Sequence, residues 1–306
     1  MQPNSSIIRL PWRLQRRLDA AAGAFLNPRQ GPAIDFAQPP GEQALVSPDS
    51  VSWRIFKNPI ALYVGGLAGV ILELAEPAVR TGVWEHSSFR KDPLGRLQRT
   101  GSAAMVTIYG ARSIALPMIA GVARMHAKVS GKTPAGASYR ASDAPLLAWV
   151  HTTAAFGIAE AYDRYVEPLS RAELDSMYRE GVPVARLYGA PDSPCSDAER
   201  RALFDSMRSR LEPSPIVFQF LQIMLEAATL PRPLRWMQRI LAGAAVEIIP
   251  DWIRNLLGFT AVHGLRPHER WMVSLAGTVS NRIVLSESPA AQACVRVGLP
   301  VTHLYR

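Results

Sequence analysis

Apolar residues recur at helical spacing along most of this chain, and few stretches show the alternation that half-buried strands require. The longest apolar run extends from Ile60 to Leu72, and its helix is predicted to begin near Pro59 and to end near Leu74. Further helices are predicted over residues 97–108, 113–129, 144–165, 197–211, 216–230, 233–249, 250–258 and 269–285. This pattern predicts an all-α fold.

The pattern divides the chain into two parts. Residues 1–50 have a mixed composition, with an amphipathic helix predicted at 14–25 and a connector rich in proline and glycine from Asn27 to Pro48. Residues 51–306 carry the remaining helices and are predicted to form a single globular helical domain. Within it, the polar segment from Gly82 to Gly95 is expected to be irregular and to lead into Arg96.

Length and charge narrow the class of protein. The chain has 306 residues, 48% of them hydrophobic, which is enough for a substantial core. Its net charge is +9, from 34 Lys and Arg against 25 Asp and Glu, but no run of five or six like charges occurs. Because zinc-finger, RNA-reading and basic-zipper patterns are absent, we expect no nucleic-acid partner. The basic surface instead suits anionic small molecules or peripheral contact with a membrane surface.

Two features bear on the compartment. Cys195 and Cys294 form no CxxC motif, which argues against a zinc ribbon, an iron–sulfur cluster or a disulfide framework. The N-terminal residues lack the apolar stretch of a secretory signal, so a cytoplasmic location is predicted. The run from Ile60 to Leu72 is shorter than the roughly 20 residues of a membrane span, and the stretch 101–125 contains Arg112 and Pro117. Both are interpreted as buried core helices.

Motif searches leave histidine as the residue of interest. The chain has no GxSxG elbow, no HExxH helix, no phosphate-binding P-loop and no GxGxxG fingerprint, which removes the common hydrolase, metalloprotease and nucleotide classes. His263 and His268 flank a loop that is predicted to be solvated. His151 is predicted to be a core histidine, with a ligand role as the alternative. His86 either supports a site electrostatically or caps the helix that follows it.

A basic segment and a histidine segment stand out in the first half. Arg96, Arg99 and Thr100 lie close together, and His126 follows Thr100 by 26 positions. The helical spacing places Val122, His126 and Val129 on one face, and Pro117 is expected to start or kink that helix. On composition alone His126 is equally a core residue or a ligand. An imidazole in apolar surroundings, opposed by cations and a hydroxyl, suits haem iron.

Several short segments, in their order along the chain, carry a family resemblance. They are 84–89, Asp92-Pro93, Arg96-Leu97, Arg99-Thr100, 124–126 with Val129 and Gly131, Tyr139, 149–151, Tyr178 with Glu180, and 249–254. With these segments the chain resembles the latex-clearing-protein and MpaB oxygenase family from about Val51 to Arg282. The resemblance implies an all-helical, globin-like core that holds one haem b.

The resemblance also implies roles for individual residues. His126 corresponds to the proximal iron ligand, and Arg96 and Thr100 to the distal arginine and threonine. Arg99 stands where the rubber-cleaving members have lysine, and a guanidinium cannot coordinate iron. The distal iron position is therefore expected to be open, filled by water or taken by another ligand such as His151. Glu85 is the nearest candidate for the family's general base, and two further cations would neutralise the haem propionates, Arg124 and Lys128.

Three hypotheses about function follow. The first is a haem b-dependent oxygenase that uses dioxygen on a hydrophobic, isoprenoid-like or lipid-like substrate. The second is a haem-binding protein with a peroxidase-like or sensing role and no oxygenase turnover. The third is a helical scaffold without a cofactor, in which Arg96 and Thr100 are capping residues and His126 belongs to the core.

Overall fold

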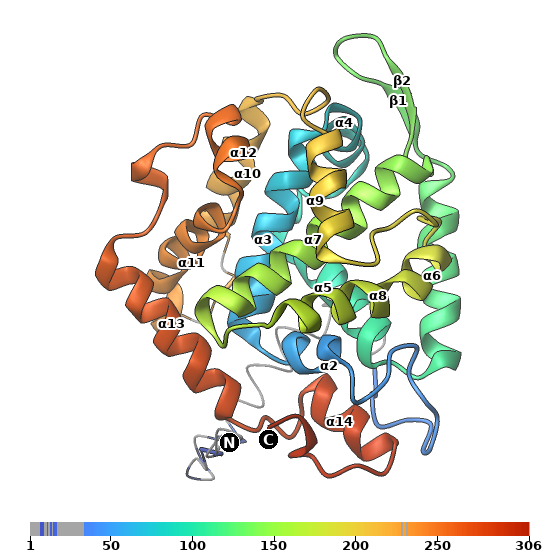
Figure 1. Cartoon of the computed structure of the whole chain (residues 1–306), viewed down its shortest axis with the longest axis vertical. Coiled ribbons are helices and arrows are strands. Elements are labelled where there is room, and N and C mark those ends of the chain that lie inside the picture. Colours follow the sequence, from blue (N-terminus) through green and yellow to red (C-terminus); the bar gives the residue numbers. More distant parts are fainter. Residues whose placement is uncertain are drawn as a thin grey trace.

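The computed structural model describes residues 34–305 apart from Ala228 and Pro231, together with six residues nearer the N-terminus: Ile7, Ile8, Pro11, Arg13, Gln15 and Arg16. Helices carry most of these residues, and the described part of the chain contains only a two-stranded sheet (Figure 1). The predicted all-α class is confirmed. The helix predicted at 14–25 lies largely outside the described residues.

The elements follow one another along the chain with short connections. They are α2 (Val51–Phe56), α3 (Pro59–Ala75), α4 (Pro77–His86), α5 (Pro93–Tyr109), α6 (Arg112–His126), β1 (Ser130–Lys132), β2 (Ser138–Arg140), α7 (Ala144–Tyr165), α8 (Arg171–Leu187), α9 (Asp197–Ser206), α10 (Pro215–Glu226), η1 (Arg232–Leu234), α11 (Arg235–Glu247), α12 (Asp251–Leu256), η2 (Ala261–His263), α13 (Pro267–Arg282), α14 (Pro289–Arg296) and η3 (His303–Tyr305).

The segment from Gly82 to Gly95 differs from its prediction. We expected it to be irregular, but α4 continues to His86 and α5 already begins at Pro93. Both α4 and α5 have a proline in the first turn and a carboxylate residue as N-cap. Glu76 accepts from the Val79 amide at 2.8 Å, and Asp92 accepts from the Gly95 amide at 3.0 Å. These caps satisfy backbone amides in the first turns, and so stabilise both helices despite the polar composition of the segment. Arg96 therefore lies inside α5.

α6 contains Pro117 in its interior and ends at His126, three residues before the predicted end. The chain then turns into a hairpin, in which Ser130 pairs with Arg140 in an antiparallel register. At the base of this hairpin, the Ala141 amide donates to the Val129 carbonyl at 2.9 Å. The hairpin therefore fixes the end of α6 relative to the start of α7.

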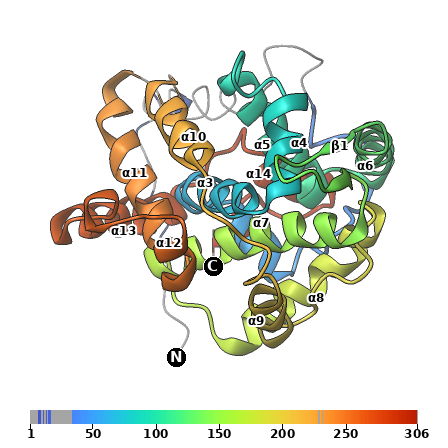
Figure 2. The same cartoon turned by 90° about the horizontal axis from the view of Figure 1, so that it is seen from above.

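The centre of the molecule is α3, which packs on α7, α11, α13, α10 and α4 (Figure 2). Its contact with α7 is a contact between backbones. A Cβ atom at Gly65 would lie 2.5 Å from the Gly157 carbonyl oxygen, and one at Gly69 would lie 3.2 Å from the Ala154 Cα. The fully buried Trp149 of α7 donates to the Leu72 carbonyl at 3.3 Å. The apolar run of α3 is thus a buried core helix, as predicted.

A second apolar cluster joins α5, α14 and residues 34–50. The buried guanidinium of Arg296 holds it together by donating to the carbonyls of Phe36 at 2.7 Å, Tyr109 at 2.7 Å and Glu42 at 2.8 Å. The described part of the predicted N-terminal extension therefore packs against the end of α5.

None of the helices in the described ranges is, by itself, long and apolar enough to cross a membrane. α3 and α4 pass a test of length and composition only when taken together, and the chain bends by 110° between them.

Candidate functional site

Helix α5 presents Arg96, Arg99 and Thr100 on one face. The Arg96 guanidinium donates to the Thr100 hydroxyl, and that hydroxyl donates to the Arg96 carbonyl at 3.0 Å. Arg99 points instead toward the preceding loop, where it donates to the Ser88 hydroxyl at 2.5 Å and lies 3.4 Å from the Asp92 carboxylate. Arg96 and Thr100 therefore form one unit, while Arg99 is held by the residues before the helix.

His126 is the last residue of α6 and lies on its inward face. Ala115 and Ile119 on this face are buried and Val122 is half-buried, whereas Met125 is 61% exposed. The prediction that His126 shares a helix face with Val122 is confirmed, whereas Val129, predicted on the same face, lies beyond the end of α6. The Nδ1 atom of His126 is buried and has no hydrogen-bond partner among the described residues. A buried ring nitrogen without a partner is uncommon in folded proteins and calls for an explanation.

Two effects keep the His126 imidazole neutral. Burial lowers its pKa, and the positive charge of Arg96 lowers the pKa further. The C-terminus of a helix by itself favours a cation, so burial and Arg96 together outweigh the helix dipole here. At neutral pH the imidazole therefore keeps a free lone pair, which is the form that binds a metal.

Glu73, in the last turn of α3, was not among the residues predicted from the sequence. It interacts electrostatically with Arg96. Burial raises the pKa of Glu73 to about 7, against the opposing effect of the Arg96 charge. The pKa of Arg96 is in turn lowered by burial, and the negative charge of Glu73 counteracts this effect. Arg96 thus couples electrostatically to a carboxyl group on one helix and to His126 on another. We call Glu73, Arg96, Thr100 and His126 the Arg96 cluster.

Glu85 and His86, predicted as a base and a supporting residue, lie elsewhere. Both are exposed at the end of α4. The negative charge of Glu85 acts on Tyr139 of the hairpin, whose pKa is raised first by burial and then by this charge. The structure therefore does not bring these two side chains to Arg96.

Arg124 and Lys128 flank His126 and are exposed. Neither forms an ion pair with another described residue, so both cations are available to a ligand at the end of α6.

His151 lies apart from the Arg96 cluster, on α7. Its ring faces α8, because a Cβ atom at Gly181 would lie 3.3 Å from its Cε1 atom. Burial lowers the pKa of His151 to about 4, and no charged group contributes to this shift. This environment is that of a neutral core histidine.

The two loop histidines also differ from each other. The His263 ring nitrogen accepts from the Thr260 amide at 3.1 Å, and the ring packs between Phe218 and Phe259. His268 is exposed at the start of α13. The predicted solvated loop therefore holds for His268, while His263 stabilises a local turn.

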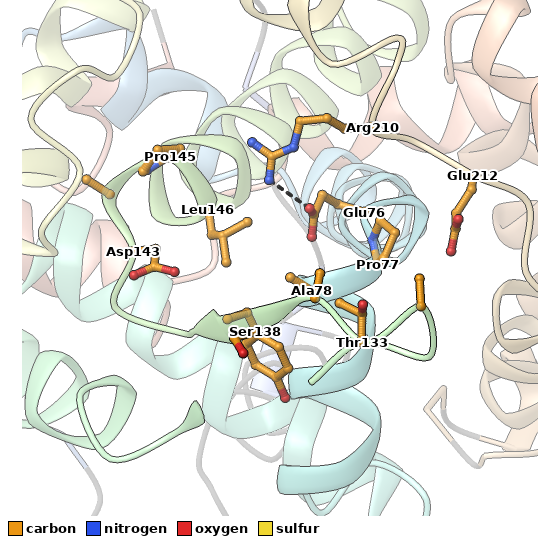
Figure 3. Close-up of a pocket in the computed structure, with 14 residues that line it drawn as sticks. Glu76, Pro77, Ala78, Thr133, Ser138, Asp143, Pro145, Leu146, Arg210 and Glu212 are labelled. Atoms are coloured by element: carbon orange, nitrogen blue, oxygen red, sulfur yellow. Dashed lines mark hydrogen bonds and ion pairs between the residues drawn. The ribbon is translucent and has the colours of Figure 1, made fainter. Parts of the chain in front are cut away.

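A pocket of about 550 Å³ lies between the start of α4, the hairpin and the start of α7 (Figure 3). Arg210 reaches Glu76 in this pocket at 2.8 Å, and Glu212 pairs with Arg80. None of the site residues predicted from the sequence lines it. Arg210 and Glu76 pair across the pocket, and Glu212 is taken up by Arg80, which lies outside the lining.

Some residues that carry the family resemblance have structural roles. The Glu180 carboxylate accepts from the amides of Val51 and Ser52 at 3.1 and 3.0 Å, and from the Ser52 hydroxyl at 2.7 Å. It thereby caps the first turn of α2 from a helix that is distant in sequence. Trp149, as described above, fills the contact between α3 and α7. Part of the resemblance therefore reflects how the chain folds.

A search of the described ranges for groups of three or more His, Cys, Asp or Glu residues able to hold a metal ion finds none. A haem iron needs only one side-chain ligand from the protein. The family resemblance assigns this role to His126.

Comparison with known proteins agrees with the resemblance seen in the sequence. The family model described as "ER-bound oxygenase mpaB/B'/Rubber oxygenase, catalytic domain" matches residues 53–281, which include the whole Arg96 cluster. No curated protein and no solved structure matches the chain. The matched region covers well over half of the 306 residues. The chain therefore belongs to the MpaB and rubber oxygenase family, and its helical domain is that of an oxygenase.

Proposed function

We propose that this protein is a haem b-dependent oxygenase that uses dioxygen on a hydrophobic, isoprenoid-like or lipid-like substrate. The observation that carries the proposal is the buried Nδ1 atom of His126, which has no hydrogen-bond partner in the described part of the chain and is subject to the charge of Arg96. An imidazole that is neutral, faces inward and has no partner among the described residues is a residue that would hold haem iron.

The surroundings of His126 also fit a haem. Arg124 and Lys128 are exposed cations within two residues of the imidazole and are the candidates to pair with the two propionates. When bound, the haem would supply an iron that binds and activates dioxygen. The protein's contribution is to bind, to orient and to place charges around that iron.

Arg96 is the residue that we assign to charge stabilisation. Its guanidinium donates one hydrogen bond to the Thr100 hydroxyl, which in turn donates to the Arg96 carbonyl, so the group is set in place before any ligand arrives. Because Arg96 is half-buried, its charge acts over a short distance through a medium that screens less than water. It is thereby suited to donate to an oxygen atom that gains negative charge.

Glu73 is the residue that we assign to proton transfer, in place of the exposed Glu85. With a pKa of about 7, the Glu73 carboxyl group is divided between its two protonation states at neutral pH. A group with this property can both accept and return a proton at the working pH. Its electrostatic interaction with Arg96 links that proton to the same cluster.

An absorption spectrum tests the haem proposal. Freshly purified protein is compared with His126→Ala, with His151→Ala and with the matched control His263→Ala, after each has been supplied with haem. We expect a strong Soret band for the wild type and for His263→Ala, and loss of most of this band in His126→Ala. Circular dichroism of each variant confirms that the helices remain.

The outcomes separate the three hypotheses. Full haem retention by His126→Ala with loss in His151→Ala would transfer the ligand role to His151. Absence of a Soret band in every protein would favour the scaffold without a cofactor. A haem protein that consumes no oxygen with terpenoid or lipid substrates would have the peroxidase-like or sensing role.

A further inference from the structure

Helix α13 carries an apolar stripe that no described element covers. Trp271, Leu275 and Val279 follow one another at intervals of four residues, and they are 65%, 47% and 37% exposed. α13 lies at the edge of the molecule next to α11 (Figures 1 and 2). On α11, Trp236 is also exposed, at 55%. Exposed tryptophans and a continuous apolar helix face are unusual on a solvated surface and indicate a binding surface.

The charges around this stripe have one sign. Exposed cations on η1, α11 and α13 and at the α13 N-cap are Arg232, Arg235, Arg239, Arg266, Arg270 and Arg282. These three helices contain only two acidic residues, and both point inward. Glu269 is 3% exposed and pairs with Arg239, and Glu247 lies 2.7 Å from Arg270. Arg239 and Arg270 are thus paired with these carboxylates, and the other four arginines make the outward surface basic as well as apolar.

We propose that the face formed by α13 and the start of α11 binds the surface of an anionic lipid bilayer. Amphipathic helices that lie in a membrane interface combine tryptophan and leucine on one side with arginine beside it. Tryptophan is enriched at the level of the lipid headgroups, and basic residues are attracted to anionic headgroups. The stripe and its arginines match both requirements.

The same charges argue against a second copy of this chain as the occupant. A symmetric dimer formed through this face would place its arginines opposite one another, and like charges oppose such an interface. An anionic bilayer removes this repulsion. The inference stands independently of the haem proposal, since it uses no residue of the Arg96 cluster.

Co-sedimentation of the full chain with vesicles tests the proposal. The vesicles contain either phosphatidylcholine alone or phosphatidylcholine with about 30% phosphatidylserine, a range in which basic residues respond to surface charge. We expect binding to the anionic vesicles that weakens as salt is raised. The double variant Trp271→Ser, Leu275→Ser should bind at least about tenfold more weakly. Arg282→Gln should bind about fivefold more weakly, through charge alone.

The matched control is Leu187→Ser, which changes a leucine of similar exposure, 43%, on α8. It should bind like the wild type. Equal binding to both kinds of vesicle, no binding to either, or an unchanged double variant would each overturn the proposal. So would light scattering that shows a dimer in the wild type and a monomer in the double variant, because the stripe would then be a protein interface.

Discussion

The contact between α3 and α7 and the Arg96 cluster both involve helix α3, but their packing differs. At the contact, glycines bring two backbones together, and the fully buried Trp149 fills the adjacent space. The Arg96 cluster begins at Glu73, which directly follows Leu72 in α3. There, charged side chains are half-buried, and one ring nitrogen has no hydrogen-bond partner among the described residues. The first region specifies the fold, and the second keeps unused binding capacity.

The difference has a physical basis. A tight contact between backbones leaves no space for a ligand and gains from every atom that it buries. Buried ionisable groups with shifted pKa values cost stability, and such groups concentrate at functional sites. The same helix thus supplies a close backbone contact at Gly65 and a carboxyl group with a raised pKa at Glu73.

The largest expected effect comes from filling the contact. Gly65→Ala places a methyl group 2.5 Å from the Gly157 carbonyl oxygen, so the two backbones must separate. We expect a loss of about 3 kcal/mol or more in the free energy of unfolding, measured by urea denaturation. Gly69→Ala, with its nearest backbone atom at 3.2 Å, should cost less.

Gly66→Ala is the matched control, because a Cβ atom at Gly66 meets nothing within 4 Å. As alanine favours a helix more than glycine does, this variant should gain about 0.5 to 1 kcal/mol. Equal stability of Gly65→Ala and Gly66→Ala would show that the contact between the backbones is not as close as described.

The next effect depends on pH and concerns the Arg96 cluster. The pKa of Glu73 is raised from 4.5 to about 7, so the folded protein binds this proton more tightly than the unfolded chain does. Its ionisation costs stability, a cost that is absent below pH 4.5 and complete above about pH 7. Glu73→Gln should therefore raise the free energy of unfolding by about 2 kcal/mol near pH 8.

Near pH 4 the same substitution should change little, because Glu73 is then protonated in both states. Thermal unfolding at both pH values measures the difference. Glu85→Gln, at an exposed position of α4, serves as the control and should stay within about 0.5 kcal/mol at both. If Glu73→Gln changed the free energy of unfolding equally at both pH values, this would contradict the conclusion that burial raises the pKa of Glu73.

The two regions also differ in how far the sequence predicts them. The apolar run of α3 and the range of α7 follow from local spacing, and α7 has the predicted bounds, 144–165. The position of His126 on the inward face follows from the same spacing. Helix α8 was not predicted, since its polar sequence contains Gly181 and Pro183, which weaken a helical pattern.

Glu73 was missed for a different reason. Its role depends on an electrostatic interaction with Arg96, which is 23 residues away and on another helix. Spacing within one helix carries no information on such an interaction. The available signal was a single carboxylate in the apolar stretch Ile71-Leu72-Glu73-Leu74. Charged residues are rarely buried without a partner, so this pattern indicates a partner from elsewhere in the fold.

The smallest effect concerns the start of α5, which positions Arg96. Asp92→Ala removes the N-cap acceptor of the Gly95 amide and should cost about 1 kcal/mol. Asp92→Asn keeps an acceptor and loses only the exposed ion pair with Arg99, so its cost should be a few tenths of a kcal/mol. Amide hydrogen exchange locates the effect. Faster exchange is expected in the first turns of α5, with none in α3, because α5 opens locally while the α3 backbone stays packed against α7. Equal acceleration in both helices would mean that the cluster and the contact open as one unit.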